Sequence, residues 1–285
     1  MKQISFSVSN NTIKLNSNNS DVLNEIKMDW FTKAHLPGFK YLKETRLGHM
    51  INIILDKHTQ GSDITVNSEG KKWKLSVPDR NIRARDIVLL SLQVSTYLNE
   101  LHNIFTAHAS FIKKRSTGVL LCGGTGSGKT LFSVAASMKG WEIVSNEFTS
   151  FNSNFENTAN ILNIHLDRNL VNVLGTKDVD IGFKSMLGVK VKLIIFLKLY
   201  EGSKLNVKEI LSPNKYFYLY ETFSRITKAV DNLMTDRFDI PYLNLEDKVS
   251  SRNRSKFVKD IADNVRVISI EGNYRKAISA IDHYL

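Results

Sequence analysis

The sequence has almost no cysteine, no long apolar run and no internal repeat, and each absence narrows the class of protein. Cys122 is the only cysteine among 285 residues, which excludes an internal disulfide and fits a reducing compartment. The apolar run at residues 193–197 is far too short to cross a bilayer. The first residues alternate polar and apolar side chains and lack the apolar core of a signal peptide. We therefore expect a cytoplasmic protein without a membrane span.

Positive charge is in excess, with a formal net charge of +11 and a pI of about 9.5. Such a charge attracts anionic partners such as nucleic acid, acidic proteins or phosphorylated small molecules. The short basic runs at residues 71–74, 113–115 and 252–259 are scattered along the chain and do not gather on one predicted element. Scattered lysines are typical of a solvated surface. We therefore place nucleic acid last among the expected partners.

The length allows one large domain or two ordinary ones, and the 42% hydrophobic content is that of a globular protein. Residues 1–85 are predicted to form a strand-rich α+β region, since residues 4–8 and 70–77 alternate polar and apolar side chains. Residues 86–285 are predicted to form a second domain. This domain begins with a helix at residues 86–103, where leucines and valines recur at helical spacing.

The second domain alternates strands and helices, which is typical of an α/β fold. Apolar runs and turn residues predict strands at residues 106–112, 118–122, 141–145, 161–166, 171–174, 190–199 and 265–270. Helices are predicted at residues 129–139, stopped by Gly140, and at 274–285. Another helix is predicted after Ser212-Pro213, with apolar residues at helical spacing as far as Leu233.

A complete phosphate-binding pattern lies between the predicted strand at residues 118–122 and the helix that follows it. It consists of Gly123, Gly124, Thr125, Gly126, Ser127, Gly128, Lys129 and Thr130. Glycines let backbone amides close on phosphate oxygens, and the helix directs its positive end at the same place. We predict that Lys129 reaches the β- and γ-phosphates of a nucleoside triphosphate and that Thr130 binds Mg²⁺. Cys122, at the end of the strand, is expected to be a small buried filler.

Acidic residues decide what such a loop does, because phosphoryl transfer needs Mg²⁺ and a group that positions the nucleophile. In a βαβ unit the next strand ends beside the phosphates, and here that strand ends in Ser145-Asn146-Glu147. Glu147 is therefore the best local candidate for a catalytic carboxylate and for a second Mg²⁺ ligand. The alternative interpretation is an ordinary surface residue.

Together these residues resemble the catalytic domain of bacterial HPr kinase/phosphorylase and its relatives. His108 lies 22 residues before Thr130 and Asn146 lies 16 residues after it, and both spacings agree with that family without a gap. The match is close over residues 106–150 and holds in outline elsewhere. The resemblance implies a P-loop domain with a mixed sheet, of the type shared with phosphoenolpyruvate carboxykinase.

The resemblance also implies an activity, the transfer of the γ-phosphate of ATP to a hydroxyl, as on a protein serine. The acceptor is then a hydroxyl-bearing peptide, protein or small molecule, and a homo-oligomer is compatible with the family. The implied catalytic residues are His108 near the transferred phosphate, together with Glu147 and Lys129. For His108 the alternative is a strand histidine without a catalytic role.

Two positions depart from the family. Asn146 stands where the family has the aspartate that acts as base, and an amide cannot take a proton. Asn172 stands where the family has a glutamate in a later strand. The nearby acids that could substitute are Asp167, Asp178 and Asp180.

Three hypotheses follow from this pattern. The first is a kinase for a hydroxyl, and the second is a non-catalytic nucleotide-binding partner that has lost its base. The third is a P-loop ATPase that acts on nucleic acid, suggested by the charge. The third is the weakest, because such motors carry paired acids after an apolar run, and residues 193–197 lead into Lys198.

Overall fold

The computed structural model describes residues 2–28, 30–43, 49–56, 65–69, 72–78, 83–161, 172–174, 186–228 and 245–284. The chain divides into two compact units. The first unit comprises Met1–His102 and Arg225–Ser251, and the second comprises Asn103–Ser224 and Arg252–Leu285. Within the described residues, no helix combines the length and the apolar character needed to span a membrane.

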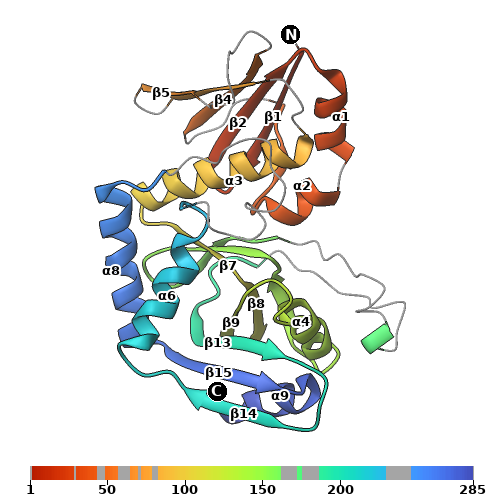
Figure 1. Ribbon diagram of the computed structural model, residues 1–285, viewed down its shortest axis with the longest axis vertical. Coiled ribbons are helices and arrows are strands. Elements are labelled where there is room, and N and C mark those ends of the chain that lie inside the picture. The colour runs from red at the N-terminus through yellow and green to blue at the C-terminus, as the bar shows by residue number, and fades with distance from the viewer. Residues whose placement is uncertain are drawn as a thin grey trace. The chain divides into compact units, whose positions relative to one another are not determined.

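The first unit is a six-stranded sheet with helices packed against it (Figure 1). Its strands, in spatial order, are β3 (Lys40–Tyr41), β1 (Lys2–Val8), β2 (Asn11–Ser17), β4 (Met50–Asp56), β6 (Lys72–Pro78) and β5 (Thr65–Glu69). Its helices are α1 (Ser20–Met28), α2 (Trp30–His35) and α3 (Ala84–Leu101). Ile4, Phe6 and Val8 are buried while the residues between them are not, so the alternation predicted for β1 is confirmed.

The helix α3 was expected to open the second domain, because the predicted boundary lay at residue 85. It groups with the first unit instead, since it packs against α1, α2 and β1. Nearly every one of its side chains is buried. A sequence pattern shows that a helix has apolar residues, but it does not show which sheet covers them.

The second unit contains a six-stranded mixed sheet, whose parallel strands are drawn as adjacent arrows in Figure 1. The spatial order is β10 (Glu142–Ser145), β8 (Ser110–Lys114), β9 (Thr117–Cys122), β13 (Val191–Leu199), β15 (Arg266–Gly272) and β14 (Leu205–Glu209). The strands β9, β13 and β15 run parallel, and the other pairs are antiparallel. A smaller sheet has the order β12 (Asn157–Ala159), β11 (Phe148–Phe151) and β7 (Phe105–His108). The described helices are α4 (Lys129–Ser137), α6 (Asn214–Ser224), α8 (Lys248–Asn264), which begins in the first unit, α9 (Tyr274–Ile281) and the 3₁₀ turn η1 (Asp282–Tyr284).

The central strands β9 and β13 of the large sheet are buried on both faces, and their alternating side chains enter two different cores. On β9, Val119 and Leu121 pack with α4 and α9, whereas Leu120 and Cys122 pack with the smaller sheet, α6 and α8. This burial explains why β9 and β13 read as near-continuous apolar runs. It also places Cys122 in the core, as expected.

Several sequence predictions need correction. The single strand expected at residues 106–112 is two strands, β7 and β8, because the chain changes sheets at Ala109. Residues 172–174 form a helical turn and not a strand, since so short an apolar run does not distinguish the two. The helix α6 ends at Ser224, although its apolar spacing continued further. Residues 162–166, 230 and 233 of these predictions lie outside the described part of the chain.

The sequence pattern also missed β11, β12, β14 and most of α8 in the second unit. The helix α8 contains the basic run at residues 252–259, which was interpreted only as surface charge. Its apolar side chains Phe257, Val258 and Ile261 are buried between the charged ones, so the run is one amphipathic helix.

The packing of α9 predicts a large cost for emptying its core face. Ile278 is 2% exposed and lies in the core that α4 shares with the large sheet. Ile278→Ala should lower the free energy of unfolding by about 2–5 kcal/mol, since it removes buried methylenes and leaves a cavity. Ser279→Ala, an exposed change on the same helix, should stay within about 0.5 kcal/mol. Urea unfolding followed by circular dichroism measures both, and equal stabilities would contradict this packing.

Candidate functional site

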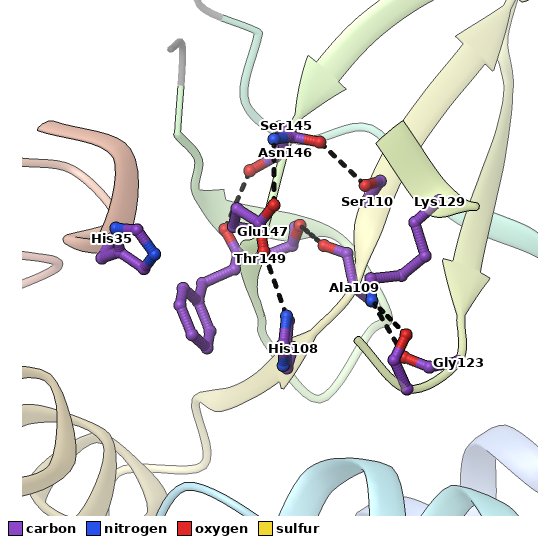
Figure 2. Close-up of polar contacts among 12 residues, drawn as sticks. His35, His108, Ala109, Ser110, Gly123, Lys129, Ser145, Asn146, Glu147 and Thr149 are labelled. Atoms are coloured by element: carbon purple, nitrogen blue, oxygen red, sulfur yellow. Dashed lines mark hydrogen bonds and ion pairs between the residues drawn. The ribbon is translucent and has the colours of Figure 1, made fainter. Parts of the chain in front are cut away.

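The candidate site is built at a corner where two neighbouring chain segments leave the large sheet together. The chain passes from β7 to β8 through Ala109 and from β10 to β11 through Asn146 and Glu147. In the smaller sheet, Phe148 lies opposite His108. The Thr149 hydroxyl donates a hydrogen bond of 3.1 Å to the Ala109 carbonyl, which joins the two segments at the bend. The end of β9 lies beside this corner, since Leu121 pairs with Ser110, which donates to Asn146, and Figure 2 draws Lys129 in the same view.

Hydrogen bonds of Ser145 and Asn146 fix the backbone of this corner around Glu147, which has a left-handed conformation. The Ser145 hydroxyl donates to the Phe148 carbonyl and accepts from the Ile161 amide, both at 2.8 Å. The backbone N–H of Asn146 donates to the Ile161 carbonyl at 3.1 Å. Between these bonds Glu147 has a φ of 64°, a conformation that costs a non-glycine residue about 1–2 kcal/mol. Strain of this kind is tolerated where surrounding bonds fix the backbone, and it recurs at functional sites.

The glycine-rich loop joins the end of β9 to the start of α4, as the sequence predicted. Gly123 has a φ of 144°, and a Cβ there would lie 2.5 Å from the Ser127 Oγ, so no side chain fits. By contrast, Gly124 and Gly126 are exposed, and a Cβ at either would meet nothing within 4 Å. The loop is tied to the neighbouring strand by a 3.0 Å bond from the Leu199 amide to the Ser127 carbonyl. The loop is therefore tightly packed at Gly123 and open to solvent along its rim, at residues 124–126.

Lys129 and Thr130 follow the loop in the first turn of α4. The Lys129 side chain is 6% exposed, and its Nζ donates to the carbonyls of Gly123 at 2.9 Å and Gly124 at 3.2 Å (Figure 2). Thr130 is half-buried beside it. The ammonium group is thus folded over the loop, held by two neutral oxygen acceptors. Charge-assisted bonds to phosphate are stronger than bonds to neutral carbonyls, so a phosphate can displace these contacts.

At the corner, His108 and Glu147 are paired. The distance from the His108 Nε2 to the Glu147 Oε2 is 3.1 Å, with the histidine 6% and the glutamate 27% exposed. The Asn146 Oδ1 accepts a 3.0 Å hydrogen bond from the Ser110 hydroxyl, and the Asn146 Nδ2 lies 3.5 Å from the Glu147 Oε1. Asn146 is 2% exposed. Of the residues on this strand end, Glu147 alone therefore offers a carboxylate with access to solvent.

The residues present fit the phosphates of a nucleotide. The Ser127 Oγ is buried and has no hydrogen-bond partner among the described residues. The rim at Gly124–Gly126 is open, and the ammonium of Lys129 lies behind it. For Mg²⁺ the protein offers the Thr130 hydroxyl and the Glu147 carboxylate, and no group of three or more His, Cys, Asp or Glu side chains forms a metal site in the described residues. Such a sparse set fits Mg²⁺, which keeps several waters and takes its other ligands from phosphates.

The predicted site residues therefore come from three segments of the second unit. His108 ends β7, residues 123–130 follow β9, and Glu147 follows β10. Asn172, the counterpart of a family glutamate, is exposed in a helical turn. The three acids considered as substitutes, Asp167, Asp178 and Asp180, lie outside the described residues.

Sequence reasoning missed the part that Ser110 and Thr149 take in holding the corner. Both are fully buried hydroxyls that stand next to a buried phenylalanine, Phe111 on β8 and Phe148 on β11. A buried polar side chain must find a hydrogen-bond partner. The hydroxyl residues beside these phenylalanines could have indicated buried hydrogen bonds, although the sequence did not reveal their partners.

Burial makes the thiol beside the loop unreactive. Desolvation raises the pKa of Cys122 to about 12, although the nearby Lys129 charge lowers it in part. At pH 8 the native thiol should therefore stay protonated and react with iodoacetamide far more slowly than a free cysteine, which ionises near pH 8.5. Unfolding in guanidinium should restore ordinary labelling. Fast labelling of the native protein, followed by mass spectrometry, would contradict the burial of β9.

Comparisons with known proteins add no family to this geometry. No protein-family model matches the chain, and a search of curated proteins finds no match either. The chemistry of the site therefore rests on its own residues.

Proposed function

We propose that this chain is an ATP-dependent kinase that transfers the γ-phosphate to a hydroxyl on a peptide, a protein or a small molecule. The observation that carries the proposal is that the loop at residues 123–130 starts beside the corner that holds the His108–Glu147 pair, since Ser110 pairs with Leu121 near the end of β9 and donates to Asn146. A phosphate-binding loop alone is compatible with many functions. A carboxylate hydrogen-bonded to a histidine beside it supplies what hydroxyl transfer needs, a group that holds the acceptor.

In this proposal the loop backbone and Lys129 hold the triphosphate, and Thr130 and Glu147 are the candidate Mg²⁺ ligands. Mg²⁺, when bound, neutralises charge that develops on the phosphoryl oxygens. Glu147 accepts a hydrogen bond from the acceptor hydroxyl and orients it, and His108 holds the Glu147 carboxylate in place. The transition state of phosphoryl transfer is loose, so orientation and charge contribute more than removal of the proton.

Asn146 is compatible with this division of roles. It is buried, and its side chain accepts from Ser110 and faces Glu147. A second carboxylate at that place would lie next to the Glu147 carboxylate, and two like charges disfavour each other's ionised form. A neutral amide at this place avoids that repulsion beside the Glu147 carboxylate.

Nucleotide binding should depend on Lys129. Lys129→Ala should weaken Mg·ATP binding about 10- to 150-fold, because a hydrogen bond to a charged group contributes about 1.5–3 kcal/mol. Lys208→Ala, which removes an exposed lysine from the edge strand β14, serves as the control and should bind like wild type. Isothermal titration calorimetry measures both. Equal affinities of wild type and Lys129→Ala would refute a nucleotide site at this loop.

Turnover should depend on Glu147. Glu147→Gln should lower the rate of phosphate transfer at least tenfold, about 1.4 kcal/mol of barrier, and change ATP affinity much less. Glu142→Gln, which removes the acid at the start of β10 that pairs with Lys113 of β8, should leave the rate unchanged. The assay follows γ-labelled phosphate from ATP into candidate acceptors and into water.

The same assay separates the competing functions. Tight ATP binding by wild type without transfer or release of phosphate would favour a non-catalytic nucleotide-binding partner. Phosphate release that nucleic acid stimulates would favour a nucleic-acid-linked ATPase. Transfer that Glu147→Gln leaves unchanged would remove Glu147 from the mechanism.

A further inference from the structure

A second charged feature of the second unit lies away from the phosphate-binding loop. A hollow of about 490 Å³ opens between α9 and the segment that follows α4, and its walls are Lys139, Arg275, Lys276, Ser279, Ala280 and His283. Lys139 follows the C-terminal end of α4, whereas the phosphate-binding loop precedes its N-terminal end, and the helix from Lys129 to Ser137 is about 12 Å long. The hollow therefore lies at the opposite end of α4 from the loop and is a separate site.

The hollow is strongly positive. Lys139, Arg275 and Lys276 carry permanent charges, His283 adds a fourth basic group, and no carboxylate lines it. The neighbouring acid Asp282 bonds to Lys114 at 2.8 Å and so does not neutralise the hollow. Within the described part of the chain, none of these three permanent cations forms an ion pair with a carboxylate.

The contacts that the cations do make are with neutral groups. The Lys139 Nζ lies 3.3 Å from the Ser279 hydroxyl, and the Lys276 Nζ contacts the Ser203 carbonyl at 2.6 Å. The Arg275 Nε donates to the Tyr274 hydroxyl at 3.0 Å. An anion would bind each of these groups more strongly than its present neutral acceptor does.

Helix stabilisation does not account for this charge. Arg275 and Lys276 lie in the first turn of α9, where the helix dipole disfavours cations. That turn is capped by the Asn273 side chain, which accepts from the amides of both residues, so the lysine and arginine heads add nothing to the cap. Acidic residues would stabilise this turn better. The positive charge therefore points to a partner outside the chain.

We propose that this hollow docks an acidic segment of a polypeptide. Three of its basic groups lie along α9 and the following turn η1, from Arg275 to His283, over about 12 Å, which matches about four residues of extended chain. That length suits several carboxylates in a row and exceeds the size of one phosphate group. No aromatic side chain lines the hollow to stack on bases, which disfavours single-stranded nucleic acid.

The docking site is tested by direct binding in the absence of nucleotide, so its outcome is independent of the proposed kinase activity. The probe is a fluorescein-labelled peptide of ten glutamates, and its anisotropy is measured with the full chain at low salt. The triple variant Lys139→Glu, Arg275→Glu, Lys276→Glu should bind the probe at least tenfold more weakly than wild type. Two of these changes put acids into the first turn of α9, where the dipole favours them, so the fold should survive.

The matched control carries the same change in net charge elsewhere. Lys27→Glu, Lys33→Glu, Lys40→Glu reverses three exposed lysines of the first unit and should keep most of the affinity. Equal losses in the two triple variants would show attraction to overall charge and overturn the proposal. So would displacement of the peptide by millimolar inorganic phosphate, which would identify a small-anion site. Tighter, hollow-dependent binding of a labelled ten-nucleotide DNA would overturn it in favour of nucleic acid.

Discussion

The constraint on which the candidate site depends is the paired change of sheets at Ala109 and at Asn146–Glu147. Two neighbouring segments leave the large sheet at the same level and continue together in the smaller one. The bend is held by the Thr149–Ala109 bond and by the bonds of Ser145 to Phe148 and Ile161. If either segment had continued straight, His108 and Glu147 would lie on different parts of the fold.

The large sheet supplies the rigidity that this corner needs. Because β9 is buried on both faces, its end is fixed by two cores at once, and the glycine-rich loop starts from a fixed point. The bond between Leu199 and Ser127 then ties the loop to the parallel strand β13. Ligand sites of open α/β sheets lie beyond the carboxyl ends of parallel strands, and this loop follows that rule.

The corner carries a single carboxylate. Glu147, which is partly exposed, pairs with His108 and lies beside the buried Asn146 amide, and the strand end at residues 145–147 has no second acid. Lys129 donates to the carbonyls of Gly123 and Gly124 in the loop. The positive hollow at α9 is separate, since α4 spans the distance between the two. The second unit thus presents two places suited to anions, one tightly built and one open.

The sequence by itself determined the strand–loop–helix unit around residues 123–130, because glycine spacing, an apolar strand and an amphipathic helix are local properties. It also indicated that the strand end at Glu147 comes close to this loop, by the order of strands and helices along the chain. The alternation of β1 and β6 in the first unit was likewise readable, since burial on one face leaves a period of two.

Only the tertiary structure decided the rest, because it depends on contacts between residues far apart in the chain. The pattern over residues 106–112 looked like one strand. The break at Ala109 arises because residues before it pair with β11 in the smaller sheet, whereas residues after it pair with β9 in the large sheet. The hydroxyls of Ser110 and Thr149 became informative once their partners, 36 and 40 residues away, were known. The helix α3 has the same apolar stripe whichever unit it joins, and the packing of α1 and α2 settled its place.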